Sequence, residues 1–249
     1  MNANNKLLIG TAKVDITPDP GEREFLLNGY TDRNKKPATG VLDRVYARAV
    51  AGSAHGRLFG LVSVDLCWIS NELREAVLSR LKAHGFDGHN LMIAATHTHS
   101  SFGGYDRSFI VQRLFGKFNE WIFEHAASRI AQAVIEAKSR MRPARLEIAL
   151  KRLKGMNRSR LDPAFVFGAD EAEPSVQPNP EKYPVDERLT VIRITDADAT
   201  STGVIVHFTA HPTILSPKNM KVSADFPGVV CSRIEETLGD DVIALYLNG

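Results

Sequence analysis

Residues 58–97 read LFGLVSVDLCWISNELREAVLSRLKAHGFDGHNLMIAATH, and this stretch decides the fold. Its first part, Leu58–Leu66, is rich in apolar and β-branched residues and predicts a buried strand. A Ser or Asn at positions 70–71 can cap the helix that follows, and Gly85 can end it. Asn90–Ala95 then predicts a second strand. This order predicts a crossover between two parallel strands, and functional groups usually lie beyond the carboxyl ends of such strands.

Further strands and helices are expected on both sides of this crossover. The apolar patterns predict strands at Leu7–Ile9, Arg44–Ala51, Leu146–Leu150, Leu189–Ile194 and Gly203–Phe208, and helices at about 118–141 and from Ser223 or Asp225 to Gly239. We therefore expect an α/β fold with mixed, partly parallel sheets and flanking helices, in a single domain that spans residues 1–249.

Two other segments carry expectations. Residues 157–187 contain five prolines with no clear period, which predicts a long loop that faces the substrate. The last nine residues, DVIALYLNG, predict a buried strand that ends where sites are commonly built. We therefore expect a parent chain that continues past Gly249.

The composition favours a small-molecule partner. The 249 residues, 43% of them hydrophobic, can bury a substantial core, and 31 basic against 29 acidic side chains leave a formal charge of only +2. Such a balance gives no field that would draw the chain to nucleic acid. No signal peptide, no membrane span of roughly 18 apolar residues and no interfacial amphipathic segment is evident, so we predict a cytoplasmic protein without stable membrane insertion. Cys67 and Cys231 predict buried structural thiols rather than a disulfide or zinc ligands, and oligomerisation stays open.

Three histidines stand directly after predicted strands. His97 and His99 are two positions apart, and in extended backbone their side chains share a face. His211 also follows an apolar strand and precedes Pro212. Imidazole is a good zinc ligand, although copper, nickel and iron also accept it. The pattern therefore predicts a metal site, the alternative being histidines hydrogen-bonded at strand edges. We expect His207, which lies inside its strand, to be a packed or hydrogen-bonded core histidine rather than a ligand.

Several short motifs, taken in order along the chain, resemble one family. They are Gly10-Thr11-Ala12-Lys13-Val14-Asp15-Ile16-Thr17-Pro18, Asn28-Gly29-Tyr30, Leu42-Asp43-Arg44-Val45-Tyr46-Ala47-Arg48-Ala49, Val62-Ser63-Val64-Asp65-Leu66, Thr96-His97-Thr98-His99-Ser100, Asn157-Arg158-Ser159, His211-Pro212-Thr213 and Ser223-Ala224-Asp225. On these motifs the chain resembles the N-terminal catalytic domain of neutral, nonlysosomal ceramidases and their bacterial relatives. Ordered motifs over most of a chain are more specific than any one of them.

The resemblance implies roles for four side chains. His97 and His211 are implied as ligands of a zinc cofactor. His99 and Arg158 are implied as residues that contact the substrate or the developing oxyanion. The implied reaction is hydrolysis of a linear N-acyl amide bond.

Two carboxylates, Asp65 and Asp225, fall in motifs of the same family. Because metal-binding histidines are commonly oriented by a second hydrogen-bond partner, we expect these carboxylates to hold a histidine tautomer beside the metal. A helix-capping role is the alternative for Asp225.

The chain departs from the family pattern in two places. Where the family has Ser-Gly-Pro-Gly, this chain has Ser100-Ser101-Phe102-Gly103-Gly104, which predicts an aromatic wall beside the site. This departure argues against ceramide. From the balanced charge and the absence of an evident secretion signal we expect a small acylated amine, amino sugar or peptide-like amide as substrate. The family's Gly-Asp-x-Ser-Pro segment and its glutamate and tyrosine zinc ligands are expected beyond Gly249, so we expect the 249 residues alone to bind zinc weakly.

Two other functions compete with amide hydrolysis of this kind. A barrel-type metal hydrolase carries a His-x-His pair at the end of its first strand, but several predicted strands precede His97 and no eightfold alternation fits the chain. The other alternative is a ligand-binding or structural domain that keeps the fold with a degraded metal site. Residues beyond Gly249 would discriminate between these functions.

Overall fold

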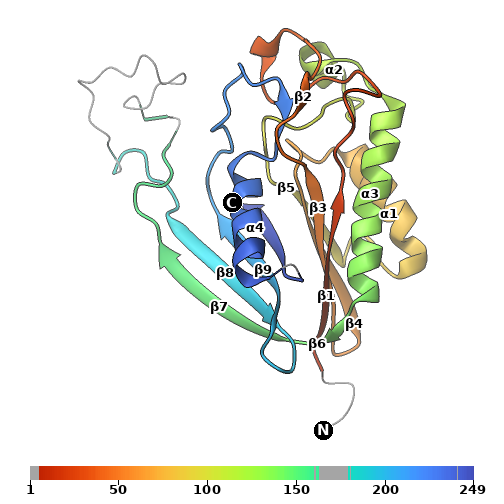
Figure 1. Ribbon diagram of the computed structural model, residues 1–249, viewed down its shortest axis with the longest axis vertical. Helices are drawn as coiled ribbons and strands as arrows, with labels where there is room; N and C mark the ends of the chain where they lie inside the picture. The colour runs from red at the N-terminus through yellow and green to blue at the C-terminus, as the bar shows by residue number, and fades with distance from the viewer. Residues whose placement is uncertain (1–5, 160, 163–178, 180, 240) are drawn as a thin grey trace.

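The computed structural model describes residues 6–159, 161–162, 179, 181–239 and 241–249, and two of its β-sheets lie face to face with helices on both outer sides (Figure 1). In spatial order, the first sheet contains β5 (Leu91–Ala95), β4 (Arg57–Val64), β3 (Tyr46–Ala54), β1 (Leu8–Asp15) and β6 (Arg142–Pro143). The second contains β11 (Ile243–Asn248), β9 (Ser201–Phe208), β8 (Arg188–Thr195) and β7 (Arg145–Arg152). A short third sheet pairs β10 (Lys221–Val222) with β2 (Gly40–Val41). The helices are α1 (Asn71–Leu81), α2 (Phe109–Phe115), α3 (Glu120–Ser139) and α4 (Asp225–Leu238), with short 3-10 turns η2 (Thr31–Arg33) and η3 (Lys82–His84).

The predicted crossover is present. β4 and β5 pair in parallel, with Val64 opposite Ala95 at their carboxyl ends. The hydroxyl of Ser70 accepts a hydrogen bond from the backbone N–H of Leu73 (3.2 Å) and so caps α1. β9 and β11 are also parallel. The α/β fold with mixed, partly parallel sheets is therefore confirmed.

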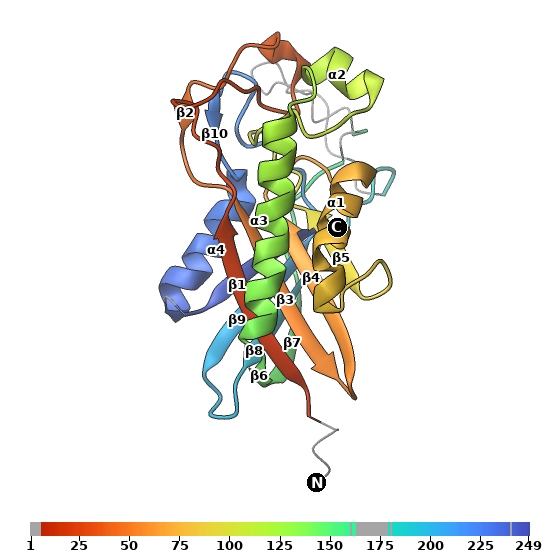
Figure 2. The same cartoon turned by 90° about the vertical axis from the view of Figure 1, so that its right-hand side faces the viewer.

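Three apolar clusters hold four layers together. α1 and α3 pack on the outer face of the first sheet, and Figure 2 shows α3 lying lengthwise along that sheet. Between the sheets, Ile9 and Val50 of the first meet Ile194 and Ile205 of the second. On the far side, α4 packs on the second sheet through Cys231 and its neighbours. Burial of these apolar side chains is the main stabilising contribution to the fold.

The Gly10 position shows why β1 carries a glycine. A Cβ atom there would lie only 2.1 Å from the backbone carbonyl oxygen of Ala137 in α3. Any side chain would push the helix away from the sheet, so glycine permits the close approach of these two elements.

The structure differs from the sequence-based expectations at several elements, among them the unpredicted two-residue strands β2, β6 and β10, and it excludes one alternative. The helix α2 was not predicted. The N-cap of α4 is Ala224, without a side-chain cap, rather than Ser223 or Asp225. The barrel-type alternative is wrong, because the strands form separate stacked sheets.

Most of the predicted 157–187 loop lies outside the described residues, namely positions 160, 163–178 and 180. The described residues of this segment form neither helix nor strand. Within the part of the chain that the structure describes, no helix is both long enough and apolar enough to span a bilayer.

Candidate metal centre

Three imidazoles converge beyond the carboxyl ends of β5 in the first sheet and β9 in the second. His97 and His99 follow β5, and His211 follows β9. The Nε2 atom of His99 lies 3.0 Å from Nε2 of His211 and 3.5 Å from Nε2 of His97. The rings of His97 and His211 face each other, with centroids 5.1 Å apart and planes inclined by 22°. The structure therefore brings together the three histidines that the sequence singled out.

His97 is fixed through its backbone and its Nδ1 atom. Its backbone N–H donates to the carbonyl of Leu66 (3.0 Å), just beyond the β4–β5 pairing. Its Nδ1 lies 2.5 Å from the carbonyl oxygen of Cys67. Because a carbonyl can only accept, Nδ1 carries the proton and Nε2 presents its lone pair. The φ angle of +71° places His97 in the left-handed region, which costs about 1–2 kcal/mol for a non-glycine residue and tends to occur at functional sites.

His99 is enclosed by the Asn28-Gly29-Tyr30 motif. The ring of Tyr30 packs edge-on against the imidazole, with centroids 4.8 Å apart. Gly29 has a φ of +98°, and a Cβ atom on it would lie 2.5 Å from Cγ of His99. Only glycine satisfies both the backbone conformation and this contact, which explains the motif's glycine.

Arg33 is a supporting residue that sequence reasoning missed. Its Nη1 atom donates to the backbone carbonyls of His99 (2.6 Å) and Asn28 (2.7 Å), and its guanidinium lies 4.9 Å from the ring centre of Tyr30. The side chain is only 4% exposed, and burial lowers its pKa to about 10. Nothing in the local pattern around Arg33 marks it as buried, because one of its acceptors, the carbonyl of His99, is 66 residues away in the chain.

Asn248 joins the two histidine-bearing segments and was also missed. Its Nδ2 donates to the carbonyl of Thr96 (3.4 Å), the residue before His97. Its Oδ1 accepts from the backbone N–H of Ala210 (3.3 Å), the residue before His211. One amide side chain thus sets the spacing between the two segments.

Asp65 supports the first sheet and is not hydrogen-bonded to a histidine in the described structure. Its Oδ2 accepts from Nη1 of Arg48 (2.5 Å) and from the backbone N–H of Tyr46 (2.9 Å). Both side chains of the ion pair are at most 2% exposed. Burial lowers the pKa of Arg48, but Asp65 and the other groups around it together outweigh this effect, so the net shift is upward. This differs from the predicted role, because the carbonyl of Cys67 sets the tautomer of His97.

Among the described residues, Asp225 likewise accepts hydrogen bonds from backbone N–H groups. Its Oδ2 accepts from the N–H of Leu215 (3.0 Å), four residues after His211, and its Oδ1 accepts from the N–H of Phe226 (2.6 Å). The φ of Asp225 is +57°. The carboxylate therefore ties the segment after His211 to the start of α4, in place of the predicted tautomer-holding role.

Arg158 is exposed and lies beside an anchored neighbour. Nδ2 of Asn157 donates to the carbonyls of Thr209 (2.6 Å) and Asp186 (2.7 Å). Thr209 comes two residues before His211, so the 157–159 segment is fastened near the end of β9. No hydrogen bond between Arg158 and the three histidines occurs among the described residues, and its contact with a substrate or oxyanion stays a prediction.

The donor set fits a zinc ion. With Zn–N bonds of about 2.0–2.1 Å, tetrahedral geometry places ligand nitrogens about 3.4 Å apart. The Nε2 separations of 3.0 and 3.5 Å, which join His99 to His211 and to His97, are close to that value. The carbonyl that holds Nδ1 of His97 is a common partner behind a metal-binding histidine. The three imidazoles therefore have the chemistry that zinc requires, and their Nε2 atoms lie close enough together to surround one position.

Cys67 lies closer to this centre than the sequence indicated. Its sulfur and the nearest nitrogens of His97 and His99 all lie within 4.8 Å of one another. Cys67 and Cys231 are both buried and free, as predicted, and burial raises the pKa of each thiol to about 12. The prediction of buried thiols is confirmed, but the position of Cys67 beside the histidines was not foreseen.

Phe102 does not form the predicted aromatic wall. Its side chain is fully buried and packs edge-on against Tyr105, with ring centroids 6.2 Å apart. Its backbone forms an antiparallel bridge with Leu27. Phe102 is a core residue, so the inference that it restricts the site was wrong.

Comparison with known proteins gives a consistent result. The family model described as neutral/alkaline non-lysosomal ceramidase, N-terminal, matches residues 7–244. A neutral ceramidase of Pseudomonas aeruginosa is 30% identical over 229 residues, which are 88% of this chain and 32% of that protein. Neutral ceramidase 2 of Arabidopsis thaliana is 30% identical over 237 residues, 92% of this chain and 30% of that protein. The chain thus spans about a third of the length of these curated relatives.

Solved structures show the same likeness. The crystal structure of a neutral ceramidase from Pseudomonas aeruginosa superposes with a TM-score of 0.81 at 27% identity, covering 97% of this chain and 38% of that chain. A structure described as ceramidase complexed with C2 gives a TM-score of 0.82 at 26% identity, covering 97% of this chain and 37% of that one.

Proposed function

Since the chain belongs to the neutral/alkaline non-lysosomal ceramidase family, we propose that it forms part of the catalytic centre of a zinc-dependent hydrolase that cleaves the N-acyl amide bond of ceramide or a close analogue. The observation that carries this proposal is the convergence of the Nε2 atoms of His97, His99 and His211. A histidine-bound zinc ion is suited to amide hydrolysis at neutral pH.

His97 and His211 would hold the metal through Nε2. When bound, zinc supplies a Lewis acid for the amide carbonyl and lowers the pKa of a water from about 15.7 toward about 7. A catalytic zinc centre normally has three protein ligands and one open position, so these two histidines require at least one further protein ligand. The Nδ1 contact of His97 keeps its Nε2 available for this role.

His99 would steady the oxyanion that forms when the amide carbonyl is attacked. Its backbone is held by Arg33 and its ring by Tyr30 and Gly29, so the imidazole cannot swing away. A hydrogen-bond donor that is already in place stabilises developing charge without reorganisation. Arg158 would add a second, charged donor from the segment that Asn157 anchors.

We favour a ceramide-type substrate over the smaller amides that the sequence suggested. One argument against ceramide was the aromatic wall predicted at Phe102, and that side chain lies in the core. The named activity of the relatives in Pseudomonas aeruginosa and Arabidopsis thaliana supports the same choice.

The test compares zinc content and turnover of a short-chain ceramide for the wild type and two variants. His97→Ala removes a proposed ligand, and His207→Ala is the matched control because His207 lies in β9, four residues before His211. We expect His97→Ala to lose zinc and turnover together while His207→Ala keeps its zinc. Unchanged metal content in His97→Ala would contradict the proposal.

A further inference from the structure

The helix α2 exposes an apolar surface. Phe109 is 81% exposed, Ile110 69% and Leu114 43%, although each is a large hydrophobic side chain. The helix lies at the same end of the molecule as η2 and the β2–β10 pair, as both ribbon views show (Figures 1 and 2). No interfacial amphipathic segment is expected from the sequence, and the seven-residue helix α2 nevertheless places three large apolar side chains in contact with solvent.

Cationic side chains surround this apolar surface. A pocket of about 490 Å³ beside α2 has apolar walls from Leu26 and Phe109. Three cationic side chains line the same pocket: Lys35, Arg113 and Lys117. Apolar walls among cations match the chemistry of one lipid molecule, which combines an acyl chain with an anionic headgroup.

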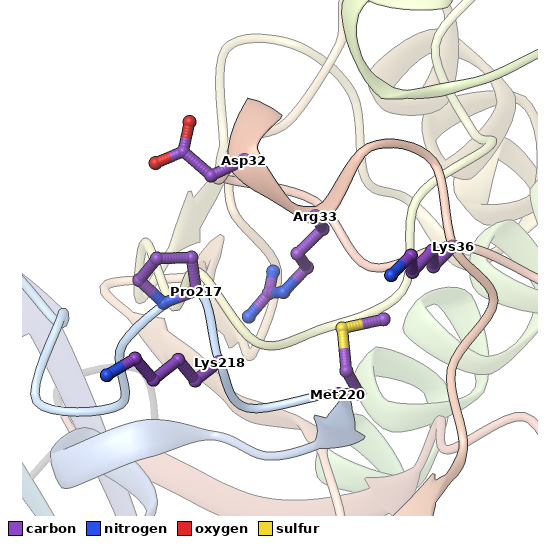
Figure 3. Close-up of a pocket in the computed structure, with 6 residues that line it drawn as sticks. All are labelled: Asp32, Arg33, Lys36, Pro217, Lys218 and Met220. Atoms are coloured by element: carbon purple, nitrogen blue, oxygen red, sulfur yellow. The ribbon is translucent and has the colours of Figure 1, made fainter.

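A second pocket, of about 390 Å³, is lined by residues of the same 32–36 loop and of the 217–220 segment. It is lined by three more cationic side chains: Arg33, Lys36 and Lys218. Figure 3 shows Arg33 reaching toward the segment that carries Pro217, while Asp32 turns its carboxylate away. Asp32 is the single acidic residue among those lining the two pockets.

We propose that α2, the 32–36 loop and residues 217–218, together called the docking face, bind the surface of an anionic lipid bilayer. Phe109 and Ile110 enter the interface, and the exposed cationic side chains around them contact the headgroups. Arg33 is not one of these, because it is only 4% exposed and donates to the carbonyls of Asn28 and His99. An apolar centre with a cationic rim is complementary to such a surface, because a bilayer offers anionic charge above an apolar layer. The inference rests on the proposed function, since a long-chain N-acyl amide is itself a membrane lipid.

The docking face is joined to the metal centre by one side chain. Arg33 lines the second pocket and also donates to the backbone carbonyl of His99 (2.6 Å). The Arg33 side chain alone would therefore connect a bilayer on the docking face to the segment that carries His97 and His99. This arrangement would bring a membrane-embedded amide toward the centre.

Vesicle sedimentation tests the docking face without any turnover. The full chain is mixed with vesicles of equal parts phosphatidylcholine and phosphatidylglycerol, or of phosphatidylcholine alone. We expect binding to the anionic vesicles that weakens as salt is raised, because the headgroup contacts are screened. The double substitution Phe109→Ser with Ile110→Ser should reduce the partition coefficient by about tenfold or more.

The matched control is Ile148→Ser with Leu150→Ser on β7. These side chains are 66% and 73% exposed, similar to the α2 pair, but they lie on the second sheet. The control should bind vesicles like the wild type, and Arg113→Glu with Lys117→Glu should remove the preference for anionic vesicles. Circular dichroism confirms that each variant is folded before its binding is compared.

Three results would overturn the proposal. The first is no binding to anionic vesicles by the folded wild type, and the second is equal loss of binding in the α2 and β7 variants. The third is absent vesicle binding together with an oligomer of the wild type that light scattering detects and that dissociates in the α2 variant. That result would mean that the docking face binds a second copy of the chain. Loss of zinc or turnover alone bears on the proposed function and leaves this measurement unchanged.

Discussion

The two sides of the metal centre are built in different ways. On the His97–His99 side, Gly29 and Tyr30 press directly against the His99 imidazole, and Cys67 holds the His97 ring. On the His211 side, Asn248 and Asp225 act on the backbone before and after the histidine. The first side is shaped mainly by close packing, and the second is tied by polar side chains.

This difference predicts how each side responds to substitution. A packed site tolerates no added atoms, because a new methyl group must displace a ring or the backbone. A single hydrogen bond contributes only about 0.5–1.5 kcal/mol, so its loss has a smaller effect. Substitutions that disturb the packing on the His97–His99 side should therefore lower the free energy of unfolding more than substitutions on the His211 side.

The largest effect is expected for Asp65→Ala, beneath the first side. This change leaves Arg48 buried and unpaired, which costs about 3–5 kcal/mol of the free energy of unfolding. Urea denaturation measures the loss. Arg48→Met in the same chain should restore much of it by removing the buried charge, and a double variant no more stable than Asp65→Ala would contradict this account.

Gly29→Ala should destabilise the protein next most strongly. Its Cβ would meet His99 at 2.5–2.7 Å, and alanine is also strained at a φ of +98°. We expect a loss of about 3 kcal/mol together with weaker zinc binding. Gly56→Ala is the control, because Gly56 has a φ of +75° with no atom within 4 Å of its Cβ position. Equal losses in the two variants would show that backbone strain, and not the contact with His99, decides the effect.

Asn248→Ala should destabilise the protein less than these two substitutions, and its main effect should be weaker zinc binding. The variant loses the hydrogen bonds to Thr96 and Ala210, so the two histidine-bearing segments can separate. We expect about tenfold weaker zinc binding, with about 1–2 kcal/mol lost from the free energy of unfolding. Competition with a chromogenic chelator measures the zinc affinity. Unchanged affinity would remove Asn248 from the account of the second side.

The smallest expected change is in the reactivity of the two buried thiols. Burial raises the pKa of Cys67 and Cys231 to about 12, which lowers the thiolate fraction at pH 8. We expect metal-free native protein to react with a thiol reagent only slowly at pH 8, and rapidly once unfolded. In the Cys231→Ser variant Cys67 is the only remaining thiol. Fast reaction of this thiol in the native variant would show that solvent reaches the His97–His99 side of the centre.

The elements and the histidines were predictable because their signals are local. The crossover of residues 58–97 follows from strand and helix patterns, and His97 and His211 directly follow apolar strands. Arg33 and Asn248 were missed because their partners are 66 and 152 residues away in the chain. Phe102 was misplaced because a single aromatic residue among small ones has no period that indicates which way it points.

The central claim is that His97 and His211 hold one zinc ion between the two sheets. Anomalous scattering at the zinc edge, from crystals of the zinc-loaded protein, tests it most directly. We predict a single strong peak within bonding distance of the Nε2 atoms of both residues. A peak bound to only one of them, or a zinc ion elsewhere on the protein, would contradict the claim.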